Sequence, residues 1–372
     1  MSAKNIPPFK ITPAIISLIA EISQMAGRLS VLEDAAKAVR LRRINRIRTI
    51  QGSLAIEGNT LSIEQITAIL EGKRIIASAR EIQEVRNAIN AYELFEQWQP
   101  SSKNDLLDAH RILMTGLLDA PGKFRTGGVG VMKGKTVIHL APPADRVPYL
   151  INELLHWLKT TDQHPLIAGS VFHYEFEFIH PFADGNGRMG RLWQTLIFSK
   201  WNSLFANIPV ESLVYEHQAE YYAALNQSTK NAESSVFIEF MLNVILQSMR
   251  ETIKSDQVTD QVTDQVKKLL RIFDSDFLSA SELMQKLNLS HRPTFRKNYL
   301  HPALNQGLIE MTVPDKPTSR LQKYRITPRG MSIILTPGKE VSWNGFFKKN
   351  TCPDLKLDGR DAQKNQERKT PR

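Results

Sequence analysis

The sequence is most informative along one continuous stretch, Ile179-His180-Pro181-Phe182-Ala183-Asp184-Gly185-Asn186-Gly187-Arg188-Met189-Gly190-Arg191. The apolar residues that follow its glycines recur on one helical stripe, namely Met189, Leu192, Trp193, Leu196 and Ile197. Three polar residues share another face of the same helix, namely Arg188, Arg191 and Thr195. We therefore expect the glycines to lie at the N-terminus of a helix whose two arginines point away from the core.

The residue types in this stretch predict a site for phosphate groups. Free backbone N–H groups and the positive end of the dipole at a helix N-terminus bind anions, and glycines let a phosphate approach closely. The two arginines can bind successive phosphates, and Asp184 offers the carboxylate oxygen that Mg²⁺ takes beside substrate phosphates. His180, with Phe182 as a buried anchor beside it, can accept a proton from an attacking hydroxyl. Together they predict nucleotidyl or phosphoryl transfer.

Each of these features also has an ordinary structural interpretation. A single histidine beside aromatic residues is usually packed in a core, Gly-x-Gly is a weak signal, and two arginines three residues apart usually line a solvated face. Their occurrence together in one short stretch, with an acid at the metal position, favours the functional interpretation.

The stretch from His180 to Arg191 resembles the Fic family signature His-x-Phe-x-[Asp/Glu]-Gly-Asn-Gly-Arg-x-x-Arg, without a gap. The resemblance implies a protein adenylyltransferase, which moves AMP from ATP with Mg²⁺ onto a hydroxyl side chain (Tyr, Ser or Thr) of a target protein. It also implies roles for the individual residues. His180 would be the general base and Asp184 the Mg²⁺ ligand. Asn186 would contact the phosphates together with the amides of Gly185 and Gly187. Arg188 would bind the β-phosphate and Arg191 the γ-phosphate.

The resemblance covers roughly residues 10 to 250 and includes further nucleotide and target contacts. Related sequences that phosphorylate tend to carry Lys in place of Gly187, so this glycine favours AMP transfer. The nucleotide-binding segment then runs from Gly185 to Arg191, through Met189 and Gly190, and Tyr221-Tyr222 resembles the pair that lines the adenine pocket. Thr229 stands where many members have Asn. His110 and His173 also resemble family positions, although both are first interpreted as packing or hydrogen-bonding residues.

A hairpin is predicted from Val129 to Leu140 around Lys133-Gly134-Lys135. It is similar to the family flap, whose exposed edge aligns the target by strand pairing, with Val129, Gly130, Val131 and Met132 as the edge residues. An ordinary surface hairpin would account for the same sequence.

The segment Ser53-Leu54-Ala55-Ile56-Glu57-Gly58-Asn59 resembles the family's inhibitory motif [Ser/Thr]-x-x-x-Glu-[Gly/Asn]. The resemblance implies that Glu57, with Ser53 in the same motif, pairs with Arg191 and occupies the place that the γ-phosphate needs. A bidentate Arg–carboxylate pair competes directly with an Arg–phosphate pair. The chain is therefore similar to the self-inhibited class with an N-terminal inhibitory helix. In some relatives the same glutamate supports removal of AMP.

The sequence predicts a mainly α-helical fold, with a Fic-type helical core, a small β-hairpin flap and a C-terminal winged-helix domain. The expected parts are an N-terminal helical region with the inhibitory motif (1–100), the catalytic core (101–250), a linker or solvated helix (251–266), a winged helix-turn-helix (267–330) and a basic, flexible tail (331–372). Ser62-Ile63-Glu64-Gln65 predicts a capping box. In the winged helix, Ser290 is predicted as an N-cap, Leu283, Leu287 and Leu289 as core, and Pro314-Asp315-Lys316-Pro317 as the turn between two strands.

Composition limits the partners and the compartment. The formal charge of +10 favours a polyanionic partner, either nucleic acid or nucleotide phosphate, and 42% hydrophobic residues exclude global disorder. Cys352 is the one cysteine and excludes a disulfide framework. Because the N-terminus has no apolar signal core and no uncharged run could span a bilayer, we expect a cytoplasmic protein without a membrane partner.

Three classes of function stay open at this point. The chain is an adenylyltransferase, a transferase that uses another nucleotide or removes AMP, or a DNA-binding regulator whose Fic domain is a sensor. The winged helix would bind DNA or dock a protein. Self-modification and a homodimer are further alternatives, while the target protein, the modified residue type and the oligomeric state are not encoded in any pattern of this sequence.

Overall fold

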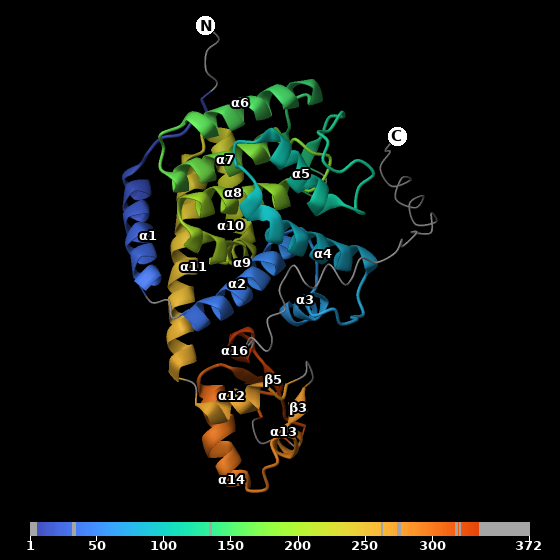
Figure 1. Ribbon diagram of the computed structural model, residues 1–372, viewed down its shortest axis with the longest axis vertical. Coiled ribbons are helices and arrows are strands. Elements are labelled where there is room, and N and C mark those ends of the chain that lie inside the picture. The colour runs from blue at the N-terminus through green and yellow to red at the C-terminus, as the bar shows by residue number, and fades with distance from the viewer. Residues whose placement is uncertain are drawn as a thin grey trace. The chain divides into compact units, whose positions relative to one another are not determined.

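The computed structural model describes residues 6–31, 35–133, 136–261, 263–273, 277–316, 319 and 321–334. The chain divides into two units, Met1–Thr336 and Pro337–Arg372, and the second lies outside the described residues. The first is mainly helical, as predicted, with a β-hairpin and a small three-stranded sheet (Figure 1). In the described part, no helix combines the length and the apolar character that a membrane span requires.

Helices follow one another over the first hundred residues: α1 (Pro13–Val31), α2 (Ala35–Ile56), α3 (Ile63–Leu70), α4 (Ala79–Leu94) and the 3₁₀ turn η1 (Phe95–Gln97). The chain leaves α2 after Ile56 and turns at Glu57 and Gly58. The predicted capping box opens α3, because the Ser62 side chain accepts the Gln65 N–H and the Gln65 side chain accepts the Ser62 N–H.

The helices around the signature come next: α5 (Lys103–Met114), α6 (Val147–Thr160), α7 (Pro165–Ile179), α8 (Asn186–Trp201), α9 (Val210–Glu216), α10 (Gln218–Asn231) and α11 (Ser235–Gln261), with the 3₁₀ turns η2 (Ala144–Arg146) and η3 (Ser203–Asn207). α7 packs against α8, α1 lies along α11, and α2 lies against α9 (Figure 1). The N-terminal helices and the helices around the signature are therefore packed on one another and do not form separate bodies.

α8 begins directly after Gly185, so the glycines lie at a helix N-terminus as predicted. Its apolar stripe is buried, and so is its polar face: Arg188 and Arg191 are only 5% and 2% exposed. The prediction that the two arginines point away from the core is wrong. Acidic and hydroxyl groups on or next to α2 and α4 cover that face, and a guanidinium can be buried when its N–H groups are paired.

The predicted hairpin is present, with β1 (Gly130–Lys133) antiparallel to β2 (Thr136–Leu140). The register shifts between Val131 and Met132, which marks a bulge or irregularity in the edge strand. Residues 134 and 135 of the predicted turn lie outside the described residues.

The C-terminal domain consists of short elements: α12 (Asp264–Leu270), β3 (Leu278–Ser279), α13 (Ala280–Lys286), α14 (Arg292–Phe295), a π-helical turn (Arg296–Leu300), α15 (His301–Asn305), β4 (Ile309–Met311), β5 (Lys323–Ile326) and α16 (Pro328–Ile334). β5 lies between β3 and β4 and is antiparallel to both. The two strands predicted on either side of residues 314–317 are present as β4 and β5. β3, which was not predicted, is a two-residue strand formed by pairing with β5.

The structure corrects some of the local predictions for this region and confirms others. His291, not Ser290, caps α14, with its Nδ1 accepting the Thr294 N–H at 3.3 Å. Of the two alternatives for the segment 251–266, a linker or a solvated helix, helix is present as far as Gln261, and α12 begins at Asp264. Leu283 is fully buried as predicted, and Leu287 and Leu289 pack against the same core. The predicted tail starts inside α16, and residues 335–372 lie outside the described residues.

Candidate active site

The loop between α7 and α8 is held by the side chains at its two ends. The Asn186 amide accepts the Phe182 N–H and donates to the Phe182 carbonyl, both at 2.9 Å. The Phe182 ring is fully buried and stacks on His110 of α5, with 3.6 Å between ring centroids. Asn186 therefore uses its side chain to close the loop, and only its backbone amide is left to face a phosphate.

His110 is a structural residue of this loop. Its Nδ1 accepts the Gly122 N–H at 2.8 Å, so its Nε2 carries the proton and donates to the Asp184 carbonyl at 3.0 Å. Burial lowers the pKa of His110 to about 4, which keeps the ring neutral at physiological pH. The interpretation of His110 as a packing and hydrogen-bonding residue is confirmed.

His180 ends α7 in the left-handed conformation, with φ of +50°, and its N–H donates to the Phe176 carbonyl. This backbone turn aims the half-buried ring at the space in front of α8. The ring Nδ1 has no hydrogen-bond partner among the described residues and lies 3.9 Å from the Glu177 carboxylate. Burial raises the pKa of Glu177, but His173, His180 and Arg191 outweigh burial, so that its pKa is lowered and it faces His180 as an anion.

Arg125 connects the His180 turn to the base of the hairpin, a role that the sequence did not indicate. Its Nε donates to the His180 carbonyl at 2.8 Å, while its other nitrogens reach the carbonyls of Gly127 and Pro142, which flank the hairpin. Its own N–H donates to the Pro181 carbonyl. The start and the end of the predicted flap are thus fixed beside the predicted base.

The N-terminus of α8 is shaped for an anion. Gly185 has φ of +85°, and a Cβ at this position would come within 2.7 Å of the Met114 sulfur. The first intrahelical hydrogen bond runs from the Met189 N–H to the Gly185 carbonyl, so the amides of Asn186, Gly187 and Arg188 precede it and point toward the cavity end of the helix.

Arg191 is paired with the predicted inhibitory segment. One of its terminal nitrogens donates to Glu57 Oε1 at 2.7 Å and to the Ser53 carbonyl at 3.0 Å, and its Nε donates to Ser53 Oγ at 3.2 Å. Burial alone would lower the pKa of Arg191, but Glu57 reverses the effect and holds it above the usual value. A Cβ on Gly187 would overlap Glu57 Oε1, so the carboxylate lies directly against the start of α8.

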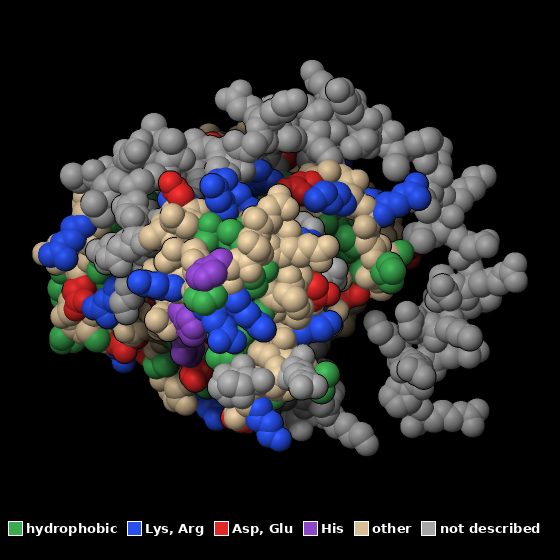
Figure 2. Space-filling model, turned by 90° about the horizontal axis from the view of Figure 1, so that it is seen from below, with side chains coloured by type: hydrophobic (Ala, Val, Ile, Leu, Met, Phe, Trp, Pro, Cys, Tyr) green, Lys and Arg blue, Asp and Glu red, His purple; other side chains and the backbone are tan. Residues whose placement is uncertain are grey.

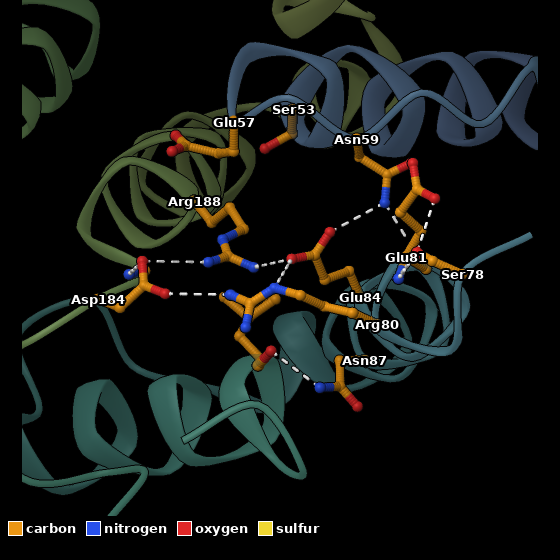
Figure 3. Close-up of polar contacts among 12 residues, drawn as sticks. Ser53, Glu57, Asn59, Ser78, Arg80, Glu81, Glu84, Asn87, Asp184 and Arg188 are labelled. Atoms are coloured by element: carbon orange, nitrogen blue, oxygen red, sulfur yellow. Dashed lines mark hydrogen bonds and ion pairs between the residues drawn. The ribbon is translucent and has the colours of Figure 1, made fainter. Parts of the chain in front are cut away.

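Arg188 and Asp184 belong to a second polar cluster that includes two residues of α4 (Figure 3). Arg188 lies 3.4 Å from Asp184 and 3.6 Å from Glu84, and Arg80 lies 3.4 Å from Asp184 and 3.3 Å from Glu84. Sequence reasoning missed Arg80 and Glu84, because neither belongs to a motif.

Asp184 is the residue of this cluster that is suited to be a metal ligand. Its carboxylate is 43% exposed, and within the described ranges no three His, Cys, Asp or Glu side chains form a metal-binding group. Such a site suits Mg²⁺, which is commonly held by one or two carboxylates together with substrate phosphates.

A cavity of about 190 Å³ brings part of the predicted site together, without Asp184 or Arg188 in its lining. Its lining includes Glu57, His180, Gly187, Arg191, Tyr221 and Tyr222. The buried Tyr221 hydroxyl lies 3.1 Å from His173 Nε2, whereas Tyr222 is 40% exposed. Thr229 also lines the cavity, but its hydroxyl donates to the Leu225 carbonyl and accepts from Tyr174.

Comparison with known proteins identifies the family. A crystal structure of a Fic family protein from Desulfovibrio desulfuricans G20 is 54% identical, with a match that covers 86% of this chain and 98% of that one at a TM-score of 0.66. The chain belongs to the Fic family. Residues 100–198 match the Fic/DOC family, and residues 264–327 match the Filamentation induced by cAMP protein Fic-like, C-terminal domain.

Other Fic proteins match over shorter regions. Protein adenylyltransferase fic-1 of Caenorhabditis briggsae is 32% identical over 222 residues, which are 56% of this chain and 42% of the relative. This chain thus spans less than half the length of the curated relatives that it matches. A structure of Fic-1 from C. elegans, 24% identical with a TM-score of 0.54, covers 66% of this chain and 73% of its own and shares the fold.

Proposed function

We propose that this Fic protein is a protein adenylyltransferase that transfers AMP from ATP to a hydroxyl side chain of a target protein or of itself. The observation that carries the proposal is the single cavity that His180, Arg191 and the N-terminus of α8 share. A general base, a cation and an anion-binding helix end are the groups that such a transfer needs. The names of the curated relatives support the same activity.

Each step of the reaction is assigned to particular groups of the site. The target hydroxyl oxygen forms a bond to the α-phosphorus of ATP, and the bond between this phosphorus and the β-bridging oxygen breaks. His180 accepts the hydroxyl proton, and pyrophosphate leaves. The amides at the start of α8 hold the phosphates in line with the attacking oxygen. Bound Mg²⁺ would neutralise phosphate charge beside Asp184.

We further propose that Glu57 inhibits the transfer in the resting protein. The Glu57–Arg191 pair, at 2.7 Å, occupies the guanidinium that the γ-phosphate requires. Glu57 also lies against Gly187 at the helix end where phosphates would bind. ATP that binds beside this carboxylate would be turned so that its α-phosphorus is out of line with the hydroxyl.

Labelled ATP tests the proposal. The Glu57→Gly protein, incubated with cell lysate, should transfer label to protein from α-³²P-ATP and not from γ-³²P-ATP. Transfer from γ-³²P-ATP would identify a kinase instead. Absence of any transfer from either nucleotide by the Glu57→Gly protein would reject catalysis and support the sensor alternative.

The C-terminal domain offers a second candidate function, DNA binding. Basic side chains on α14 and the π-helical turn are exposed: Arg292, Arg296 and Lys297. Figure 2, which views the molecule from below, shows Lys, Arg and His side chains close together on that face. An affinity for duplex DNA that falls steeply with salt and is lost in an Arg292→Ala, Arg296→Ala, Lys297→Ala triple variant would support this function. Unchanged binding in the variant would reject this surface.

A further inference from the structure

Two arginines and two carboxylates alternate in a closed ring at the start of α8 (Figure 3). Glu84 Oε1 faces Arg80 at 3.3 Å and Arg188 at 3.6 Å, and the two Asp184 oxygens each lie 3.4 Å from one of these arginines. Arg188 comes from the signature helix, whereas Arg80 comes from the first turn of α4. Arg80 is therefore brought to the signature from 104 residues away.

The four members of the ring differ in their freedom to move. Glu84 is only 12% exposed, and its Oε2 accepts the Asn59 amide at 2.9 Å, so its position is fixed. Asp184 Oδ1 accepts the Gly185 N–H at 2.7 Å, which fixes this carboxylate at the helix end. Arg80, in contrast, is 58% exposed and can turn toward solvent without loss of packing.

The charges of the ring cancel one another. Two guanidinium groups face two carboxylates at distances where unlike charges attract. A divalent cation at Asp184 would replace the guanidinium groups as partner of that carboxylate. Glu84 would then be the one carboxylate of the ring that pairs with Arg80 and Arg188. The anion nearest to them would be the phosphates that accompany the cation.

We propose that Arg80 is a third phosphate-binding arginine, which leaves Asp184 and binds the β- and γ-phosphates of the nucleoside triphosphate when the metal–nucleotide complex enters. The inference rests on the proposed function, because it takes the start of α8 as the phosphate site. Glu84 holds Arg188 and Arg80 close together before the nucleotide arrives. Arg80 then contributes to binding of the triphosphate and of pyrophosphate, and it does not contribute to binding of AMP.

The test compares ATP with AMP in the Glu57→Gly protein, whose Arg191 is released. Dissociation constants for ATP with Mg²⁺ and for AMP are measured by calorimetry for this protein and for the same protein with Arg80→Ala. Loss of one charge-assisted contact should weaken ATP binding by about tenfold. AMP, which lacks the two outer phosphates, should bind equally to both proteins. Arg80→Lys should recover part of the loss, because it restores the charge without the fork of donors.

Arg86→Ala is the matched control, since Arg86 is an exposed arginine on the same helix. It should leave both dissociation constants unchanged. ATP binding that is unchanged or tighter in Arg80→Ala would overturn the proposal, and so would an equal loss of ATP and AMP binding. If the Glu57→Gly protein itself binds no ATP, the proposed function fails together with the inference. If the Glu57→Gly protein binds ATP and the added Arg80→Ala change does not weaken that binding, only the inference about Arg80 fails, and the proposed function stands.

Discussion

His180 is held in an unfavourable backbone conformation by contacts that only this site supplies. A left-handed residue other than glycine costs roughly 1–2 kcal/mol. Arg125 offsets part of this cost by donating its Nε N–H to the His180 carbonyl, while Phe182 anchors the following loop. The imidazole is thereby directed into the cavity beside an anionic Glu177, an arrangement suited to a base that becomes a cation as it accepts a proton.

His180→Ala should therefore lower AMP transfer by at least about a hundredfold, the usual contribution of a positioned base. ATP binding should stay within about twofold, because the base acts in the transition state more than in the ground state. Rates with labelled ATP and dissociation constants from calorimetry check both statements. His156→Ala, an exposed histidine on α6, is the control and should change neither. A correctly folded His180→Ala protein with the wild-type rate would remove the base assignment.

At this scale the sequence predicted the residues of the signature and the Glu57–Arg191 pair, which lies at 2.7 Å. Signature residues are recognisable because they are consecutive and their spacing has a chemical reason. Arg80, Glu84 and Arg125 were missed because each acts through a partner far along the chain, and no local pattern marks such a residue. The role of Asn186 also differs in part, since its side chain bonds to Phe182.

Among the elements, α2 is positioned by a close approach to α9. A Cβ on Gly52 would lie 2.6 Å from the backbone of Glu211, so only glycine fits between the two helices. Gly27 of α1 is also helical, but a Cβ there would meet nothing within 4 Å. Capping boxes and hairpins are predictable from local sequence, whereas close approaches of this kind depend on two distant segments.

The two glycines should respond in opposite directions to the same substitution. Gly52→Ala should lower the free energy of unfolding by about 2 kcal/mol, because the methyl group forces α2 from α9. Gly27→Ala should raise it by about 0.5–1 kcal/mol, because alanine reduces the entropy of the unfolded chain and favours helix. Urea denaturation measures both. A stable Gly52→Ala protein would contradict the close packing of these helices.

Glu175 on α7 lines a second cavity, of about 340 Å³, which shares Tyr174, Phe178 and Thr229 with the cavity at His180 and Arg191. Burial raises the pKa of its carboxyl from 4.5 to about 7. As the pH rises from 4.5 to about 7, the unfolded chain releases this proton while the folded chain keeps it. The free energy of unfolding therefore falls across this window.

Glu175→Gln, a neutral isostere, should raise the free energy of unfolding by about 2 kcal/mol at pH 8 and leave it unchanged near pH 4.5. Thermal unfolding at the two pH values provides the measurement. Glu220→Gln replaces an exposed glutamate on α10 that lies 3.9 Å from His217, and it should change the free energy of unfolding by less than about 0.5 kcal/mol at either pH. Equal effects of Glu175→Gln at both pH values would show that the charge of Glu175 is not responsible.

Over the whole molecule, long-range hydrogen bonds add to the packing of the N-terminal helices on the helices around the signature. Thr12 donates to Glu239 of α11, Asn45 of α2 donates to the Asn207 carbonyl, and Gln218 of α10 donates to the Ile56 carbonyl at the end of α2. The last of these contacts holds the end of α2, next to Glu57, against α10. The sequence predicted an N-terminal region and a core as successive parts, but their common packing follows from contacts that sequence order does not reveal.

Because Glu57 and Arg191 are 134 residues apart and meet only in the folded chain, their coupling is a property of the whole fold. If the carboxylate keeps Arg191 from the γ-phosphate, wild-type transfer should be slow, and Glu57→Gly should raise the rate by about tenfold or more, as one charge-assisted pair is worth about 1.5–3 kcal/mol. Glu57→Gly combined with Arg191→Ala should lose this gain, because the released arginine is the group that positions the phosphate. Rates of AMP incorporation for wild type, both single variants and the double variant form a mutant cycle. A rate that Glu57→Gly leaves unchanged, or a double variant as fast as Glu57→Gly, would place the inhibition elsewhere in the molecule.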